Sequence, residues 1–457
     1  MEWNPVVKLL MPEIKEAIRK RDWDTLTDVV SSWEPIDIAD LLTEIELEDA
    51  LTLFRLLPPE LQSEAFAKLD VGLQQTLLER LSDAEAKAFL SEIKPDDRTE
   101  LLEELPEELA HRILQVLTPE DRKEALELLA FPENSVGRLL TPDYVAVKPS
   151  WTIGQALEHI RRNGRDAETI DVIYVVDDNG FLLDDIPIRR FILAHPEERV
   201  EAIMDHSVVS IVAEADQEEA VRLMEKYDLI CLPVTDSKGK LLGIVTVDDM
   251  VDVLQEEQTE DFTKLSAIEA PPVDLDFITK IKEVPLTKLY RSRITWLFLL
   301  LVMDMVTGGI IQGFESTIAR YVVLVTFLPV LVDTAGNAGS QSATLVIRAM
   351  ALGTVEMRDW IYLLGRELFV AGALGLTMGL GISFMGIFRG GSAHVALVVV
   401  LTMIINVIVG SLIGVLLPFI FSKLKKDPAT ASTPLVTTLA DIVGTAIYLG
   451  IASFMLR

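Results

Sequence analysis

The sequence predicts a multi-domain membrane protein with an N-terminal α-solenoid, a duplicated α/β region, a linker helix and a five-helix transmembrane domain. Three observations predict this order. Helix signals recur with a period of 24 residues within residues 1–130, β-rich segments occur twice within residues 136–260, and long apolar segments fill residues 291–457. A chain of 457 residues is long enough for about three domains.

Charge is divided unevenly along the chain. Of 71 acidic and 41 basic residues, 8 acidic and 12 basic residues lie from Leu286 onward. The first 285 residues therefore hold 63 acidic and 29 basic residues, a net charge of −34. Such a region disfavours nucleic acid and favours cations as partners, although a merely well-solvated surface has the same composition. The single cysteine, Cys231, excludes an intrachain disulfide and fits a reducing compartment.

The 24-residue period predicts paired short helices over residues 1–130. Six aligned half-repeats share it: 57–69, 70–81, 81–93, 94–105, 105–117 and 118–129. Each opens with Pro, Ser or Asp, continues with acidic residues and then places apolar residues at i, i+3 and i+4, which are helix-start signals. Helix pairs on a fixed period stack into an α-solenoid. On its outer surface, Asp96, Asp97 and Glu100 present carboxylates on one helix face, where acidic residues are ordinarily only solvated.

Residues 136–200 and 201–260 are two copies of one α/β unit. Each copy contains a strand, a helix, a strand, a turn, a strand and a helix, and DNG and SKG supply the two hairpin turns. The copies resemble a pair of CBS domains, regulatory modules that often bind adenosine nucleotides. This resemblance implies that Thr246 and Asp249, at the end of GIVTVDD, hold a nucleotide ribose. The first copy departs from the pattern with Pro187 and Arg190 at the corresponding places.

A dense acidic stretch follows the second copy. It comprises Asp248, Asp249, Asp252, Glu256, Glu257, Glu260 and Asp261. Carboxylates at helical spacing repel one another by a few tenths of a kcal/mol per pair. A divalent cation with oxygen ligands would relieve that repulsion, and a solvated charged helix is the alternative. Residues 262–290 then form a linker helix that leads into the membrane.

Five apolar segments are long enough to cross a bilayer: 294–314, 321–347, 361–388, 394–421 and 431–456. Nine Lys and Arg residues flank the ends on one side and three flank the ends on the other. This asymmetry predicts a cytoplasmic N-terminus and an external C-terminus. No cleaved signal peptide is expected at the N-terminus, because a basic region followed by an apolar region is missing there.

Polar residues inside two of these spans indicate an ion path. Asp441 lies near the middle of the last span, on one stripe with Thr437 and Thr438. An intramembrane acid is costly and suggests ion or proton passage, with a structural hydrogen-bonded Asp as the alternative. The second span carries Asp333 and Asn337 among glycines that permit close helix approach or an irregular backbone beside a cavity. A symmetric dimer would pair two such stripes.

The order of these regions and four motifs resemble the MgtE family of bacterial magnesium channels. The motifs are LPVLVDTAGNAGSQSATLVIRA at 328–349, DPATAS at 427–432, PLVTTLADIVG at 434–444 and TVDD…TEDF at 246–262. The resemblance implies a homodimer in the bacterial inner membrane. It implies a Mg²⁺ pathway lined by the second and fifth spans, with Asp441 as the principal ligand and with Thr437, Gly444 and Asn337 beside it.

The same resemblance implies that cytosolic Mg²⁺ closes the pore by drawing the acidic domains together and moving the linker as a plug helix. The implied regulatory ligands are Asp216, Glu218, Asp228, Asp249, Asp252, Glu257, Glu260, Asp261, Asp427, Glu64, Asp96 and Glu100. Some family members also bind ATP in the CBS pair. Asp333 would add a second carboxylate to the path or alter its selectivity.

Two other functions remain open from the residues themselves. Oxygen ligands also accept Co²⁺, Ni²⁺ and Mn²⁺, so a channel for other divalent cations fits the same pattern. A membrane-anchored sensor without a pore also fits the CBS pair, although the intramembrane Asp441 disfavours it. An enzyme is not expected, because the sequence shows no nucleophile–base pair, Gly-rich phosphate loop or metal triad.

Overall fold

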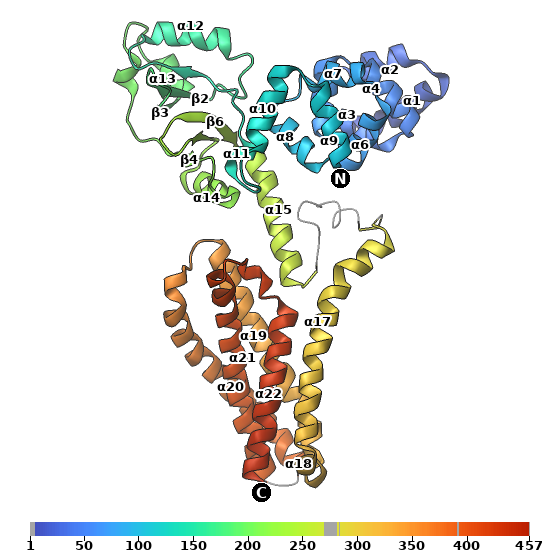
Figure 1. The fold of residues 1–457 in the computed structure, drawn as a ribbon, viewed down its shortest axis with the longest axis vertical. Coiled ribbons are helices and arrows are strands. Elements are labelled where there is room, and N and C mark those ends of the chain that lie inside the picture. The colour runs from blue at the N-terminus through green and yellow to red at the C-terminus, as the bar shows by residue number, and fades with distance from the viewer. Residues whose placement is uncertain (1–4, 269–280, 283, 391–392, 457) are drawn as a thin grey trace. The chain divides into compact units, whose positions relative to one another are not determined.

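The computed structural model describes residues 5–268, 281–282, 284–390 and 393–456. It comprises two compact units, Met1–Leu254 and Gln255–Arg457. The first unit holds the helical array and both α/β copies, and the second holds the long apolar helices (Figure 1).

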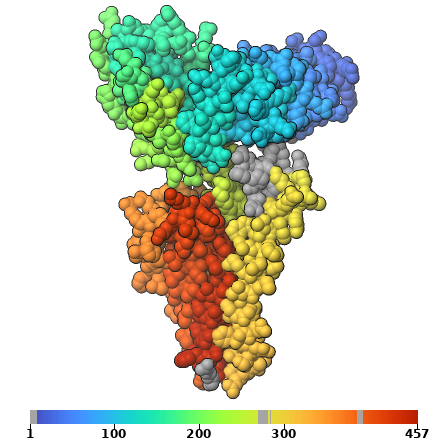
Figure 2. Space-filling view, viewed as in Figure 1, coloured from blue at the N-terminus to red at the C-terminus, as the bar shows by residue number. Residues whose placement is uncertain are grey.

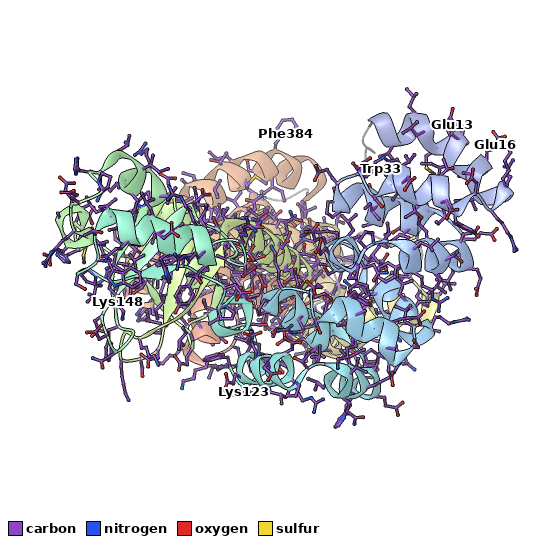
Figure 3. The ribbon with its side chains drawn as sticks, turned by 90° about the horizontal axis from the view of Figure 1, so that it is seen from above. Glu13, Glu16, Trp33, Lys123, Lys148 and Phe384 are labelled. Carbon is purple, nitrogen blue, oxygen red and sulfur yellow. The ribbon has the colours of Figure 1, made fainter. Side chains whose placement is uncertain are left out.

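Ten helices open the first unit, and they confirm the predicted α-solenoid. They are α1 (Pro5–Lys20), α2 (Trp23–Val30), α3 (Pro35–Glu44), α4 (Leu47–Leu56), α5 (Pro59–Ala67), α6 (Val71–Arg80), α7 (Asp83–Leu90), α8 (Pro95–Glu104), α9 (Glu107–Val116) and α10 (Pro119–Leu129). From α3 to α10 each helix begins 12 residues after the one before, so two helices make the 24-residue period. Figure 3 shows charged side chains projecting away from these helices, among them the exposed Glu13 and Glu16 of α1 and Lys123 of α10.

A buried polar contact repeats along the solenoid. The Gln62 side chain of α5 donates to the carbonyl oxygen of Phe54 at 2.6 Å, and Gln74 of α6 donates to that of Phe66 at 2.9 Å. Arg122 makes the same eight-residue contact from α10. Carbonyl groups at the C-terminal end of a helix lack intrahelical partners. The fourth residue of the following helix supplies a side-chain donor to such a carbonyl, in addition to the amides of Leu57 at 3.2 Å from the Phe54 oxygen and Leu69 at 3.1 Å from the Phe66 oxygen.

The two α/β copies have the predicted order and the same topology. After α11 (Val136–Leu139), the first copy contains β1 (Ala146–Val147), α12 (Ile153–Asn163), β2 (Val172–Val176), β3 (Leu182–Pro187) and α13 (Ile188–Leu193). The second contains η1 (Val200–Ile203), β4 (Ile211–Val212), α14 (Gln217–Tyr227), β5 (Cys231–Thr235), β6 (Leu241–Thr246) and α15 (Val247–Leu265). In each sheet the first strand is parallel to the second, which is antiparallel to the third.

Glycine turns join the two sheets. Gly180 and Gly239 have φ angles of 87° and 89°, in the left-handed region that glycine adopts without strain. The Leu182 amide donates to the Gly239 carbonyl at 3.1 Å, and the Leu241 amide donates to the Gly180 carbonyl at 3.0 Å. The hairpins predicted at DNG and SKG therefore also connect the copies to each other.

The second unit contains the five predicted membrane-spanning helices. Their bounds are Leu286–Gly313 in α17, Val323–Ala351 in α19, Met357–Phe384 in η2 and α20, Ala393–Lys423 in α21 and Thr433–Met455 in α22. Shorter elements between them are α18 (Glu315–Arg320) and η3 (Pro428–Thr430). The third span opens with η2 (Met357–Asp359) and continues in α20, which runs over Trp360–Gly390. Of the linker helix expected over 262–290, residues 269–280 and 283 lie outside the described residues, whereas residues 262–265 end α15 and residues 286–290 begin α17.

Small residues let the central spans pack closely. A Cβ atom added to Gly414 of α21 would come within 2.0 Å of the Gly339 carbonyl oxygen in α19, and one added to Gly410 would come within 2.3 Å of the Ala335 oxygen. Helices with such contacts approach backbone to backbone. The four-residue spacing of Ala371, Gly375 and Gly379 in α20 likewise forms a packing face, against Ile404 in the case of Gly375. Helix α17 lies along α22 (Figure 2).

The repeated Gln contact predicts a local stability difference between two neighbouring glutamines. We expect Gln74→Ala to lower the opening free energy of α5 and α6 by about 0.5–1.5 kcal/mol, because it removes the side-chain donor of the Phe66 carbonyl, which keeps the Leu69 amide at 3.1 Å. Gln75→Ala on the same helix removes only an exposed bond to Glu79 and should change it by less than about 0.5 kcal/mol. Amide hydrogen exchange of the full chain in detergent measures both, and equal effects would contradict the assigned role.

Candidate functional site

Polar side chains form an exposed stripe on the membrane-spanning helix α19. Asp333, Asn337 and Gln341 follow one another at four-residue spacing, and all three are exposed in the single chain. The Asn337 amide nitrogen donates to Asp333 Oδ2 at 3.0 Å. A carboxylate and two amides are too costly to face hydrocarbon. This stripe therefore requires either a water-filled path or contact with another protein surface.

Helix α22 brings Asp441 and Thr437 beside α19. The Thr437 hydroxyl lies 3.1 Å from that of Ser340, and a Cβ atom at Gly336 would come within 2.8 Å of Thr437 Cγ2. The same added atom would lie 3.5 Å from Asp441 Oδ1, an ordinary van der Waals distance, so the short contact at Gly336 is the one with Thr437. Asp441 Oδ1 is buried and has no hydrogen-bond partner among the described residues. An unpaired carboxylate oxygen in a membrane span is well suited to receive a cation.

Thr438 and Gly444, which were also predicted near Asp441, have surroundings that differ from those of Thr437. Thr438 is buried, whereas Thr437 is partly exposed, so the stripe predicted on α22 narrows to Thr437 and Asp441. Gly444 is also buried, and its carbonyl oxygen accepts from the Asn406 amide nitrogen at 3.3 Å. The same nitrogen lies 3.4 Å from the Leu331 carbonyl oxygen. Asn406 therefore connects α21 to both α19 and α22.

The structure adds an acid that the sequence reasoning missed. The charges that act on Asp441 come from Asp304 of α17 and Asp333 of α19. Asp304 lies in the middle of the first span and is exposed in the single chain. A lone acid within an apolar segment is a signal visible in the sequence. Three spans thus contribute carboxylates to one region of the membrane domain.

A second group of carboxylates lies where the solenoid helix α8 meets the two α/β copies, and we call it the α8 acidic cluster. Its members are Asp96, Asp97, Glu168, Asp248 and Asp249. Burial, with the charges of Asp97 and Asp249, raises the pKa of Asp96 to about 8, and burial raises the pKa of Asp249 to about 6. The nearby Lys94 pairs with Glu168 at 2.7 Å. The carboxylates of this cluster are therefore close enough to repel one another, and the lysine beside them offsets that repulsion only in part.

The α8 acidic cluster fits a hydrated divalent cation. All its donor atoms are carboxylate oxygens, and Asp96 Oδ1 is buried without a hydrogen-bond partner in the described structure. Among the residues that the structure describes, no three His, Cys, Asp or Glu side chains are grouped closely enough to hold a metal ion by themselves. Mg²⁺ commonly keeps several waters and binds through one or two carboxylates. A site of this kind needs no complete protein cage.

A third group lies at the end of α15, beside η3, and we call it the α15 cluster. It brings together four predicted residues, Glu257, Glu260, Asp261 and Asp427, with Lys264. Burial and the charge of Asp427 raise the pKa of Asp261 to about 6. The sequence contains no sign of a role for Lys264, because the fold alone brings it to Asp427.

The other predicted regulatory acids are not members of these two clusters, although Glu100 and Asp252 lie one helical turn from Asp96 and Asp249. Asp216 caps α14, Glu218 pairs with Arg222 at 3.6 Å, and Asp228 ends α14 with a left-handed φ of 52°. Glu64 on α5, Glu100 on α8 and Asp252 on α15 are exposed.

The predicted ribose-binding pair is bonded internally. The Thr246 hydroxyl lies 2.7 Å from Asp249 Oδ2 and 2.5 Å from Asp248 Oδ1. In the first copy Arg190 pairs with Asp205 at 3.0 Å and donates to the Ile203 carbonyl. Both arginine contacts would compete with a phosphate group.

Family models match most of the chain in the same order as these regions. The MgtE intracellular N domain matches residues 33–134, the CBS domain matches residues 136–194 and 200–256, and the divalent cation transporter model of MgtE matches residues 328–451.

Similar proteins cover nearly the whole chain. The magnesium transporter MgtE of Thermus thermophilus is 38% identical over 98% of this chain and 99% of the relative, and that of Bacillus subtilis is 32% identical over 93% and 92%. The solved cytosolic domain of the Mg²⁺ channel MgtE in complex with ATP is 37% identical, with a TM-score of 0.51, over 52% of this chain and 98% of that one. With five membrane-spanning helices and these matches, the chain is a multi-pass membrane protein that belongs to the MgtE transporter family.

Proposed function

We propose that the chain is a Mg²⁺-selective channel, active as a homodimer in a bacterial inner membrane, with its N-terminus in the cytoplasm and its C-terminus outside. The observation that carries the proposal is the exposed polar stripe of α19 beside Asp441, whose Oδ1 has no partner in the described structure. Magnesium is favoured over Co²⁺, Ni²⁺ and Mn²⁺ because the full-length relatives are named magnesium transporters. The oxygen ligands alone do not rank these ions.

In this proposal two chains face each other through α19 and α22. Asp441 and Thr437 of each chain then line one path, and Asn337 and Asp333 continue it along α19. Gly444 contributes its backbone beside Asp441, and the hydrogen bond from Asn406 to the Gly444 carbonyl holds that backbone in place. Asp304 adds negative charge from α17. A sensor without a pore would leave these polar side chains without a function that offsets their cost in the membrane.

We further propose five domains: 1–130, 136–200, 201–260, 262–290 and 291–457.

Closure by cytosolic Mg²⁺ follows from a difference in affinity between two states. The α8 acidic cluster and the α15 cluster hold like charges close together in the docked arrangement, so a divalent cation stabilises that arrangement more than a separated one. The acids outside the two clusters, Asp216, Glu218, Asp228, Asp252, Glu64 and Glu100, would add to the cation affinity of the cytoplasmic region.

ATP is a second ligand that we propose for the CBS pair, at Thr246 and Asp249. A relative's cytosolic domain was solved with ATP, which supports this choice of nucleotide. Because Asp249 also belongs to the α8 acidic cluster, ATP and a divalent cation would depend on the same carboxylate.

Neutralising Asp441 should stop ion passage. We expect Asp441→Asn to lower Mg²⁺ uptake by at least about tenfold, a loss equivalent to about 1.4 kcal/mol, because the shape is kept and the ligand charge is lost. Thr438→Val changes the buried face of the same helix and should keep uptake within about twofold of the parent. A Mg²⁺-sensitive dye in cells that lack their own Mg²⁺ uptake measures both variants at equal membrane expression. Parental uptake by Asp441→Asn would remove this residue from the path.

The α8 acidic cluster should make protease sensitivity depend on Mg²⁺. We expect the full-length parent to be cleaved between α10 and α11 several times faster in chelator than in millimolar Mg²⁺. In the Asp96→Asn/Asp249→Asn variant, the ratio of the cleavage rate in chelator to the cleavage rate in Mg²⁺ should fall to about one, because both the repulsion and the cation ligands are removed. Limited proteolysis with an unspecific protease measures the rates.

Glu107→Gln/Glu108→Gln is the matched control for that experiment, since it removes two exposed charges from α9. It should keep the parental ratio. An unchanged ratio in the Asp96→Asn/Asp249→Asn variant would show that its carboxylates are only a solvated surface.

Protons should replace the cation at this cluster. The pKa of Asp96 is raised from its ordinary 3.8 to about 8 in the docked state. Protonation of Asp96 therefore stabilises docking fully below pH 3.8, and this stabilisation is lost as the pH rises through about 8. Cleavage in chelator should therefore be slower at pH 6 than at pH 8.5. Asp96→Asn should be nearly independent of pH over this range, after correction for the protease's own pH profile measured on an unfolded substrate. Equal pH dependence in both proteins would contradict the assignment.

A further inference from the structure

The last turns of α15 place an ammonium group between two carboxylates. Lys264 Nζ lies 2.5 Å from Glu260 Oε1 on its own helix and 2.5 Å from Asp427 Oδ2, which belongs to η3. The other Asp427 oxygen accepts the Ala429 amide at 2.8 Å and so holds the start of η3. Both oxygens of Asp427 are therefore engaged by groups of the chain itself.

An apolar contact holds the same turn of α15 in place. Leu265, the neighbour of Lys264, packs on a buried cluster formed by α19, η3 and α22. Its buried members are Ala343, Ile347, Ala429, Ala431 and Val436. The end of α15 thus docks on the membrane domain through the chain's own side chains. The position of the ammonium follows from this docking, since Lys264 is carried to Asp427 by the helix.

The charge balance of the α15 cluster depends on Lys264. The Lys264 ammonium is paired with the carboxylates of Asp427 and Glu260, and such a pair favours the charged form of a lysine. The group is therefore charged throughout the physiological range. It supplies one positive charge beside the carboxylates of Glu260, Asp261 and Asp427. The remaining negative charge still favours a further cation.

We infer that Lys264 is a tethered cation that competes with a divalent cation for the oxygens of Asp427 and Glu260 and so raises the Mg²⁺ concentration at which the channel closes. The inference rests on the proposed regulation by cytosolic Mg²⁺. Both cations need the same oxygens, so a divalent ion binds there only when the ammonium leaves. A group tethered by a short flexible chain acts at an effective concentration of about millimolar or more. Displacement therefore requires divalent cation at a comparable level.

The test compares three variants of the full-length protein. Lys264→Gln removes the competing charge, Lys264→Arg keeps it, and Lys426→Gln removes an exposed charge next to Asp427 in the sequence. Open probability against cytosolic Mg²⁺ is recorded in excised patches. We expect half-closure of Lys264→Gln at roughly three- to tenfold lower Mg²⁺, with the other two variants within about twofold of the parent.

A second measurement follows the lysine itself. An amine-reactive reagent, quantified by mass spectrometry, should label Lys264 of the parent faster as Mg²⁺ increases, because the ammonium is released from Asp427. Labelling of the exposed Lys123 serves as the reference. A parent that closes with Mg²⁺ while Lys264→Gln closes at the same or a higher concentration overturns this inference alone. A parent whose open probability ignores Mg²⁺ contradicts the proposed regulation and the inference with it.

Discussion

A carboxylate withdrawn from bulk water has to be neutralised by a proton, an ammonium group or a metal ion, because its charge is otherwise poorly solvated. Three regions of this chain meet that demand in different ways. In the α8 acidic cluster the pKa of Asp96 rises to about 8, so a proton remains within reach at neutral pH. In the α15 cluster the Lys264 ammonium neutralises Asp427. In the membrane Asp441 Oδ1 has no partner in the described part of the chain, and the permeating cation itself is the group we propose for it.

These solutions divide the work between sensing and transport. A site that exchanges a proton or an ammonium group for Mg²⁺ responds to concentration, because the competing group sets the level at which the ion binds. A site without such a competitor is suited to passing an ion on. The glycine contacts of α19 with α21 and α22 support ion passage, since they bring the helices close together beside Asp441.

The fold was largely predictable because its signals are local. Helix starts at 12-residue intervals, two DNG-like hairpin turns and five apolar segments each depend on residues that are neighbours in sequence. The surroundings of individual side chains were less predictable. Thr437 and Thr438 look alike in the sequence, and helix packing alone decides that Thr438 is buried. The approach of Lys264 to Asp427 joins residues 163 positions apart, which no spacing rule predicts.

In the candidate site, too, some residues were predictable from local sequence signals and others depended on the tertiary fold. Asp441 and Asn337 were identified because polar residues in apolar spans are conspicuous, and Asp96 and Asp249 came together although they lie on different domains. Asp304 was equally visible but was passed over, because it stands alone without a polar stripe around it. Glu168 carries no motif and joins the α8 acidic cluster only through the tertiary fold.

The central claim is that one chain both conducts Mg²⁺ and is closed by it from the cytoplasmic side. The most direct measurement is Mg²⁺ flux into liposomes that contain the purified protein, with the Mg²⁺ concentration set independently on each side of the membrane. The account predicts flux above that of protein-free liposomes when the cytoplasmic face is in chelator. It also predicts a decrease of several-fold when that face is held at millimolar Mg²⁺ and the driving gradient is kept constant. Absence of flux, or flux indifferent to Mg²⁺ on the cytoplasmic face, would contradict it.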